Sequence, residues 1–493
     1  MIGRLAVRSL TAHPVRSAVL AAGFGLGVGV MAILLGVAQI VLEQSRAPAL
    51  LGGGDVVVGM APRVPARLLL AGTLQADALR SRIRAAAPSH SSTLFLLRGG
   101  QATAVAASGE IPSLRREVGD DDAAGIAAWR DSSDDVAWTQ DTPERTLRYI
   151  DRFHPIPDAP EWAESWAEWL YFNGRTADAR FYLTLLVGPA TGEGRRAAGV
   201  RLQLDRGGRV ETFSASQPIT DDEALRAPDL TIGANTVRLD GMRYRIHLDL
   251  RAEDGRRATG DLVIEASAGR LVPPIEIPGA RGWRTGYVVP VMSGALDGAI
   301  EVNGERLAFA GGTGYHDHNW GFWEGVSWQW GQVQAGDLSL LYGRIFPPRD
   351  AADPDRLPAF VGVLGPEGPL AYASTLGPLG RTTRVTITEA DNSRGQPRKI
   401  SVTARGADLD LDVSFDVEST VTTPAVGSGP RAGGPQTGGP QTGGLDFFQM
   451  RGTYTVTGRV GARPLNFTAP GSAETFRGRA PSAPQSGRGA AGG

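Results

Sequence analysis

The chain has 493 residues, and its 50 Lys and Arg nearly balance its 52 Asp and Glu, which leaves a formal net charge of −2. Because no clustered excess of positive charge is present, the sequence predicts no nucleic-acid partner. It contains no cysteine, which excludes disulfides, thiolate metal sites, iron–sulfur clusters and a cysteine nucleophile.

An uncharged run, residues 17–42, is the first element in chain order and is rich in Val, Leu, Ala and Gly. About 20 such residues cross a bilayer as a helix. Arg4, Arg8 and Arg16 precede the run, so the positive-inside rule places residues 1–16 in the cytoplasm and the bulk of the chain outside. We therefore expect a single-pass anchor in the cytoplasmic (inner) membrane. The alternative is a cleaved signal peptide, although its apolar region is typically only about 7–15 residues long.

The N-terminal region also resembles a known family. The stretch LTAHPVRSAVLAAGFGLGVGVMAILLG is similar to the first transmembrane segment of MacB/FtsX-type ABC transporter permeases, and LLGGGDVVVGM is similar to the start of their extracytoplasmic domain. Residues 43–120 are accordingly interpreted as a permease-like extracytoplasmic segment. The resemblance implies ABC transporter subunits as partners. Complete permeases of this family have four transmembrane helices, whereas no later run in this chain is long enough for another.

The remainder of the chain is predicted to be mainly β. Residues 121–150 are polar and indicate a linker with one or two short helices. From there on, short segments alternate between apolar and polar residues, which is typical of antiparallel strands in barrels or sandwiches. Hairpin turns are predicted at Asp205–Gly208, Leu239–Gly241, Val302–Gly304 and Gln334–Asp337.

Two consecutive β domains are expected, residues 151–290 and 291–480, with the break near the Pro- and Gly-containing stretch 278–294. The second includes a GGPQT-repeating insert, 424–444, which predicts a flexible loop. The Gly-, Ala- and Ser-rich tail, 481–493, is predicted to be disordered.

The stretch GTGYHDHNWGFW, residues 312–323, carries the densest group of chemically active side chains. If residues 314–321 form a strand, alternate side chains fall on opposite faces. One face then carries Tyr315, Asp317 and Asn319. The other face carries His316, His318 and Trp320.

Three interpretations of this motif remain open. His316 and His318 resemble a metal site, but a third ligand is needed. His154 and His247, the other histidines of the strand-rich region, have no companion ligand at motif spacing. No metal is therefore predicted, although a distant Asp or Glu would complete a site. Asp317 with His316 or His318 would alternatively form an acid/base pair in an apolar cavity, and a buried polar network that only stabilises the fold is the third interpretation.

Aromatic residues follow the motif closely and predict a cavity for a large apolar ligand. Trp323 lies within the motif, and Trp328 and Trp330 alternate onto one face of the next predicted strand. Tyr342 and Arg344 are expected to present polar groups beside them.

A second resemblance is carried by GTGYHDHNWG, by DRFHPIPDAPEWAESWAEWLYFNG and by the closing SAETFRG. These stretches are similar to the AttH-like and carotenoid 1,2-hydratase (hydroxyneurosporene synthase) family over about residues 145–480. The resemblance implies two consecutive lipocalin-like β-barrels and cofactor-free addition of water to a carbon–carbon double bond of a terpenoid. Leu170 departs from the family pattern, which has Trp at this position.

The same resemblance implies roles for particular residues. Asp317 would be the acid, His316 or His318 would tune it or activate water, and Tyr315 and Trp320 would shape the site. The remaining expected ligand contacts are Asn319, Trp323, Trp328, Trp330, Tyr342, Arg344, Trp169 and Tyr171.

We therefore expect a membrane-anchored protein that acts on an apolar isoprenoid or lipid by cofactor-free hydration or cyclisation, as a hydro-lyase would. One alternative is a non-catalytic, lipocalin-like lipid-binding subunit of an ABC transport system. A purely structural accessory subunit is the other.

Overall fold

The computed structural model describes residues 14–15, 66–75, 79, 81–98, 101–120, 128–192, 194–357, 359–366, 368–374, 384–406, 408–424 and 445–478. The predicted membrane segment 17–42, residues 425–444 of the predicted insert and the tail 481–493 lie outside these ranges. Among the helices within them, none combines the length and the apolar character that crossing a bilayer requires.

The chain divides into two compact units. The first comprises residues 1–62 and 78–140, and its described elements are β1 (Ser89–Arg98), β2 (Gln101–Glu110), α5 (Pro112–Glu117) and α6 (Ser133–Ala137). Strands β1 and β2 form an antiparallel hairpin. Helix α6 begins with a capping box, in which the Ser132 hydroxyl accepts from the Asp135 backbone N–H.

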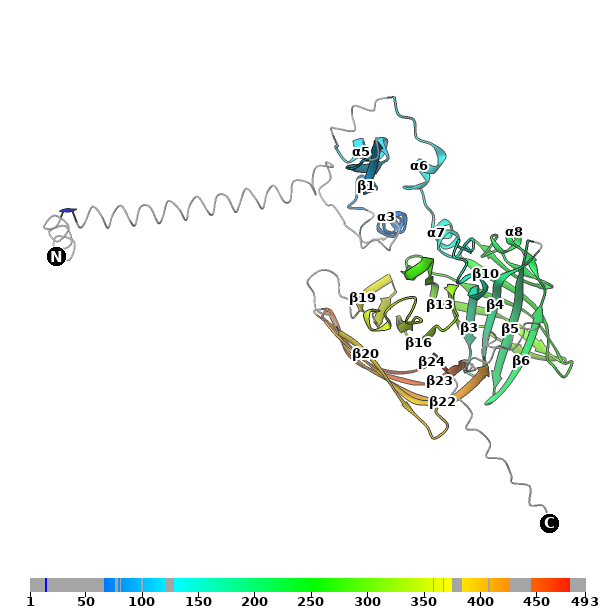
Figure 1. The fold of residues 1–493 in the computed structure, drawn as a ribbon. Coiled ribbons are helices and arrows are strands. Elements are labelled where there is room, and N and C mark those ends of the chain that lie inside the picture. Colours follow the sequence, from blue (N-terminus) through cyan, green and yellow to red (C-terminus); the bar gives the residue numbers. More distant parts are fainter. Residues whose placement is uncertain are drawn as a thin grey trace, which may run out of the picture. The chain divides into compact units, whose positions relative to one another are not determined.

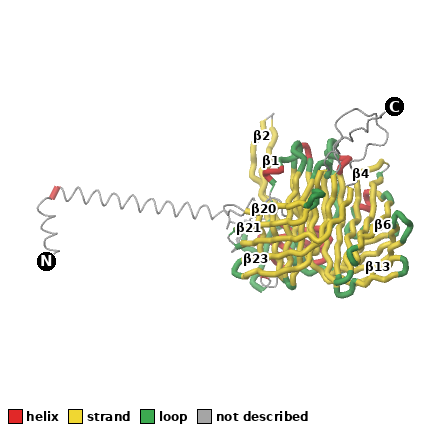
Figure 2. Tube along the Cα trace, turned by 90° about the horizontal axis from the view of Figure 1, so that it is seen from below, coloured by secondary structure: helices red, strands yellow, loops and turns green. Residues whose placement is uncertain are grey.

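The second unit comprises residues 63–77 and 141–493 and holds two antiparallel sheets (Figures 1 and 2). Its described α-helices are α3 (Ala66–Gln75), α7 (Pro143–Ile150) and the short α8 (Asp221–Ala224). The 13 strands of its first sheet are β3 (Trp166–Arg175), β4 (Ala179–Gly192), β5 (Arg195–Arg206), β6 (Arg209–Ser216), β7 (Ile219–Thr220), β8 (Thr231–Ile232), β9 (Asn235–Asp240), β10 (Arg243–Arg251), β11 (Arg257–Glu265), β12 (Val272–Pro278), β13 (Arg284–Val302), β14 (Glu305–Ala308) and β15 (Gly312–Phe322).

The first sheet curls into a nearly closed barrel. Its strands pair in the order β3, β4, β5, β6, β10, β11, β13, β15 and back to β3. Between β6 and β10 a single residue pair, Arg251 with Ser214, makes the connection. The sequence of β10, RYRIHLDLR, alternates between polar and apolar residues, and every second residue from Tyr244 to Leu250 is buried. This pattern suits a barrel strand with one buried face. This mainly β architecture is consistent with the expected lipocalin-like barrel.

The second sheet has nine strands within the described residues, paired in the order β19, β18, β17, β16, β24, β23, β22, β21, β20. They are β16 (Ser327–Ala335), β17 (Leu338–Phe346), β18 (Phe360–Gly365), β19 (Gly368–Ser374), β20 (Arg384–Asp391), β21 (Pro397–Arg405), β22 (Leu409–Pro424), β23 (Leu445–Val460) and β24 (Arg463–Gly478).

All four hairpin turns expected from the sequence join neighbouring antiparallel strands. The turn between β13 and β14 shows why its sequence is suited to it. Asn303 and Gly304 have φ values of 49° and 84°, and both residue types tolerate this left-handed region, as a two-residue hairpin requires.

The change from the first sheet to the second falls between Phe322 and Ser327, not near residue 290. The Pro- and Gly-containing stretch expected to separate the domains is a turn within the first sheet, because β12 pairs back onto β13 across it. Strand β13 then runs for 19 residues through the expected break. Residues 291–322, including the His-Asp-His motif, consequently belong to the first sheet.

Strand β15 separates two layers of the unit and is buried on both faces over most of its length. The interior of the barrel lies on one side. On the other side the second sheet makes direct contacts, since Trp330 Nε1 donates to the Tyr315 hydroxyl at 3.2 Å and Gln334 Nε2 donates to the Met292 carbonyl at 2.9 Å. Both faces of β15 are therefore removed from bulk water.

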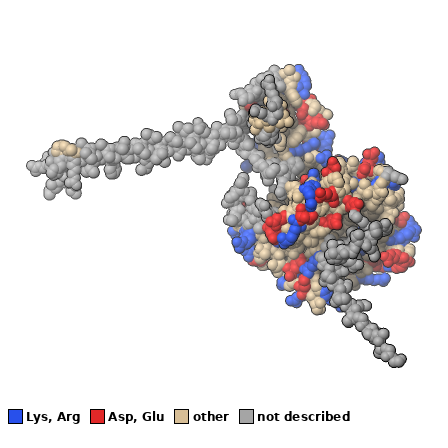
Figure 3. All heavy atoms as spheres, in the orientation of Figure 1, with Lys and Arg blue, Asp and Glu red and all other residues tan. Residues whose placement is uncertain are grey.

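On the face drawn in Figure 3, Lys and Arg atoms are interspersed with Asp and Glu atoms. This view agrees with the net charge of −2.

Candidate functional site

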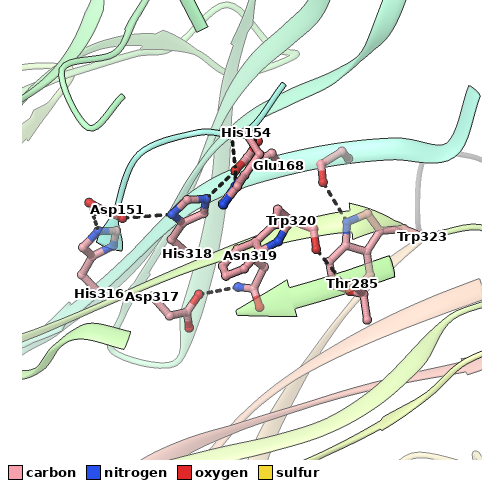
Figure 4. A network of polar contacts seen from close by, with 11 residues as sticks. Asp151, His154, Glu168, Thr285, His316, Asp317, His318, Asn319, Trp320 and Trp323 are labelled. Atoms are coloured by element: carbon pink, nitrogen blue, oxygen red, sulfur yellow. Dashed lines mark hydrogen bonds and ion pairs between the residues drawn. The ribbon is translucent and has the colours of Figure 1, made fainter. Parts of the chain in front are cut away.

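The motif forms the expected strand, and its side chains alternate as predicted. Figure 4 shows His316 and His318 directed toward Asp151, whereas Asp317 and Asn319 lie together on the opposite face. Because the two faces of β15 meet different surroundings, they form two separate polar networks.

The barrel-interior network begins where helix α7 ends. Thr142 caps this helix by accepting from the Arg145 backbone N–H at 3.2 Å, and Asp151 follows its last turn. The Asp151 carboxylate contacts His316 Nε2 at 2.9 Å and His318 Nδ1 at 3.2 Å. His316 also interacts through Nδ1 with the Tyr171 carbonyl oxygen at 2.9 Å. The end of α7 thus places one carboxylate between both motif histidines.

Glu168 on β3 supplies the second carboxylate of this interior network. Its Oε1 lies 2.9 Å from His318 Nε2 and 2.6 Å from His154 Nδ1. Although burial alone would raise the pKa of Glu168, hydrogen bonds from His154 and His318 hold it below its usual value. Burial opposes the charged form of His318, yet its two carboxylate partners raise its pKa to about 9. Asp151, Glu168, His316 and His318 are all fully buried.

The inter-sheet network lies on the other face of β15 and centres on Asp317, which is 5% exposed. Asn319 Nδ2 donates to its Oδ1 at 2.6 Å. Burial raises the pKa of Asp317 well above 3.8, and the nearby charge of Glu474 adds to the increase. Tyr315 belongs to the same face and receives a hydrogen bond from Trp330 of the second sheet.

Glu474 on β24 is a candidate functional residue that the sequence patterns did not identify. It is half-buried, and burial raises its pKa to about 7, although interactions with Tyr171 and Gln449 oppose the rise. Gln449 Nε2 lies 3.4 Å from its Oε1. Alternation within SAETFRG places Glu474 and Phe476 on the same face of β24, and this is the signal in the sequence that points to it. Asp317 and Glu474 are thus two carboxyl groups of different sheets whose charges influence each other, and we refer to them as the carboxyl pair.

Half-buried aromatic rings extend this inter-sheet face. Trp169 and Tyr171 lie opposite Asn319 and Asp317 in the register of β3 with β15. The ring centroid of Trp169 is 4.7 Å from that of Trp323 and 6.0 Å from that of Trp328. Half-buried rings that continue the group are Trp328, Trp330, Phe447 and Phe476. Their partial exposure leaves apolar surface accessible to a ligand beside the carboxyl pair.

Several predicted site residues lie elsewhere. His316, His318 and Trp320 face the barrel interior, so the strand separates them from the atoms that Asp317 would act on. Tyr342 belongs to the core of the second sheet, where its hydroxyl lies 3.4 Å from that of Tyr454. The guanidinium of Arg344 donates to the Pro354 carbonyl oxygen and lies over the Phe346 ring. Leu341 of β17 packs with the hydrophobic core of the first sheet. Because side chains alternate along a strand, Tyr342 and Arg344 lie on the opposite face of β17.

The predicted residues that do come together are Tyr315, Asp317, Asn319, Trp169, Tyr171, Trp323, Trp328 and Trp330. All of them lie on the inter-sheet side, on β3, β15, β16 or the turn between β15 and β16.

Comparisons with known proteins add little to this description. No protein-family model and no curated protein matches the chain. Among solved structures, it is similar to CghA crystallised with Sch210972, at 14% identity, covering 68% of this chain and 94% of that one with a TM-score of 0.37. It is also similar to a candidate AttH from Nitrosomonas europaea, at 16% identity, covering 63% of this chain and 91% of that one with a TM-score of 0.34.

Proposed function

We propose that this protein catalyses a cofactor-free, acid-initiated hydration or cyclisation of a carbon–carbon double bond in an apolar isoprenoid or lipid. The observation that carries the proposal is the carboxyl pair, Asp317 and Glu474, beside half-buried aromatic rings. A carboxyl group whose pKa is raised by burial stays protonated near neutral pH and is able to donate its proton.

The two carboxyl groups are suited to different steps. Asp317 transfers its proton to one alkene carbon, whose new C–H bond takes the π electrons and leaves a cation on the neighbouring carbon. The faces of Trp169 and Trp328 stabilise this cation through their π electrons. Water, or a second double bond of the same substrate, then attacks the cation. After attack by water, Glu474, with a pKa of about 7, accepts the proton of the resulting oxonium ion. After attack by a double bond, it instead removes a proton from the carbon next to the new cation. Return of this proton to Asp317 restores both carboxyl groups.

Solvent isotope incorporation tests the proposal across a panel of candidate substrates. The full-length protein is incubated in deuterated water with unsaturated isoprenoids and fatty acids, and products are analysed by mass spectrometry for one carbon-bound deuterium. Asp317→Asn should lower product formation by about 10²–10⁴-fold, the range for loss of a general acid. Binding of the same compounds, followed by tryptophan fluorescence, should persist. Asp261→Asn, an exposed carboxylate on β11, is the matched control and should leave both readouts unchanged.

A lipid-binding accessory subunit is the second candidate. Its supporting observation is the group of half-buried aromatic rings, because such rings bind apolar ligands with or without proton transfer. If the wild-type protein binds isoprenoids and incorporates no deuterium into any of them, this candidate replaces the enzyme. Normal turnover in the Asp317→Asn protein would instead refute the assignment of the acid.

The proposed location rests on the sequence alone, since residues 17–42 lie outside the described ranges. We propose that this run anchors the chain in the cytoplasmic membrane and brings it near ABC transporter subunits. Alkaline carbonate extraction of membranes distinguishes an anchored chain, which stays in the pellet, from a processed one, which is released.

A further inference from the structure

We propose that His154, Glu168 and His318 form a binding site for a divalent transition metal ion, with Zn²⁺ as the best-suited ion. This site is separate from the carboxyl pair, because it lies on the barrel-interior side of β15. One ligand atom of each residue lies within 4.8 Å of the other two. Two imidazoles and one carboxylate are a ligand set that Zn²⁺ accepts, with a fourth position left for water.

Three different elements bring the ligands together. His154 follows helix α7 in the segment that begins at Asp151, Glu168 lies on β3 and His318 lies on β15. The two strands are neighbours, and Glu168 lies opposite Trp320 in their register. A bound ion would therefore connect the segment after α7 to the wall of the barrel.

The surroundings of the ligands support a metal site beyond their mutual distances. The Asp151 carboxylate lies 3.2 Å from Nδ1 of His318, while Nε2 of the same ring points to Glu168. A carboxylate that orients the far nitrogen of a metal-binding imidazole is a recurring feature of zinc sites. On the His154 side, the indole of Trp320 stacks on the imidazole with ring centroids 4.5 Å apart. The imidazoles of His154 and His318 are thus held in place before an ion arrives.

Charge is also favourable. The arriving ion displaces the proton from the His318 imidazole, and the fully buried carboxylates Asp151 and Glu168 then supply two negative charges that balance one divalent cation. The side chain of His154 is 33% exposed, whereas that of Glu168 is fully buried. An ion can consequently reach the cluster from the His154 side.

A second histidine–carboxylate pair provides an internal control. His247 Nδ1 lies 2.8 Å from Asp261 Oδ1, but both side chains are exposed and the described residues place no third ligand beside them. The two pairs thus share their direct contact and differ in the third ligand and in burial.

The test measures Zn²⁺ binding to the untagged, chelator-treated full-length protein by competition with a chromophoric chelator, with stoichiometry from elemental analysis. One ion per chain is expected. His154→Ala should weaken binding by at least about 100-fold, because loss of a ligand should cost at least as much as loss of an outer-shell partner, which costs about 10–100-fold, and His247→Ala should leave it unchanged. Equal affinity of the wild-type and His154→Ala proteins would overturn the proposal.

A ligand exchange guards against an indirect effect of His154→Ala on folding. The chain has no cysteine, so His154→Cys introduces a unique thiolate. Bound Co²⁺ in this variant should show a thiolate-to-metal charge-transfer band that is absent from the wild-type protein. If the variant binds Co²⁺ without this band, residue 154 is not a ligand and the proposal is wrong.

Discussion

Replacing Glu474 with Gln should stabilise the protein at alkaline pH, because the wild-type carboxylate must ionise in a half-buried position. The folded-state pKa is raised from 4.5 to about 7. At about 1.4 kcal/mol per pKa unit, this rise corresponds to about 3 kcal/mol. Since the residue keeps some contact with water, which screens part of this cost, we expect a net gain of about 2 kcal/mol in Glu474→Gln. The substituted amide can still accept the hydrogen bond that Gln449 donates.

The sign of the pH dependence follows from linkage. Because the folded-state pKa of Glu474 lies above its unfolded value, the stabilising contribution of its protonated carboxyl group is fully present below pH 4.5. This contribution is lost as the pH rises through about 7. Glu474→Gln should therefore match the wild-type protein below that window and exceed its stability above it.

Urea unfolding followed by tryptophan fluorescence checks this expectation, because Trp328 and Trp330 lie near Glu474 on the same face of the second sheet. Glu305→Gln, whose side chain is 62% exposed, is the control and should not reproduce the alkaline gain. A Glu474→Gln protein that is equally or less stable than wild type above pH 7 would refute the reasoning that burial raises this pKa.

Two further substitutions probe the packing around the strand β15. Asp151→Asn should lower the free energy of unfolding by about 3 kcal/mol, because it leaves His316 and His318 without their shared buried carboxylate; Asp261→Asn should have no comparable effect in the same urea titration. Gly286→Ala should cost about 1–3 kcal/mol through overpacking, since a Cβ atom there would lie 2.4 Å from the Trp320 ring. Gly362→Ala, where the nearest atom would be 3.8 Å away, is its control, and equal thermal stability of the two glycine variants would contradict the packing argument.

Local patterns predict those features that depend on neighbouring residues in the chain. The four hairpin turns follow from Gly, and at one turn Asn, at positions that need positive φ values. The alternation of Tyr315 through Trp320 follows from the period of a strand, which does not depend on the tertiary fold.

Features that depend on the packing of distant segments cannot be predicted in this way. Glu474 interacts with Tyr171 and influences Asp317 only because the second sheet packs against the first, and no spacing in the sequence encodes that arrangement. His154 has no companion ligand nearby in the sequence, yet the fold brings it to Glu168 and His318. The stretch 278–294 joins β12 to β13, because Pro and Gly mark a tight turn within a sheet as readily as a link between domains.

The two-sided burial of β15 has a consequence for tolerance to insertion and deletion. Strand side chains alternate between the two faces with a period of two residues. Adding or removing one residue between Gly312 and Asp317 would therefore turn the Asp317 carboxyl group toward the barrel interior and the motif imidazoles toward the second sheet. Single substitutions should have different effects at odd and at even positions of this strand. In a complete mutational scan of residues 315–320, substitutions at odd positions should mainly change activity on the ligand. Substitutions at even positions should mainly lower the amount of folded protein in the cell.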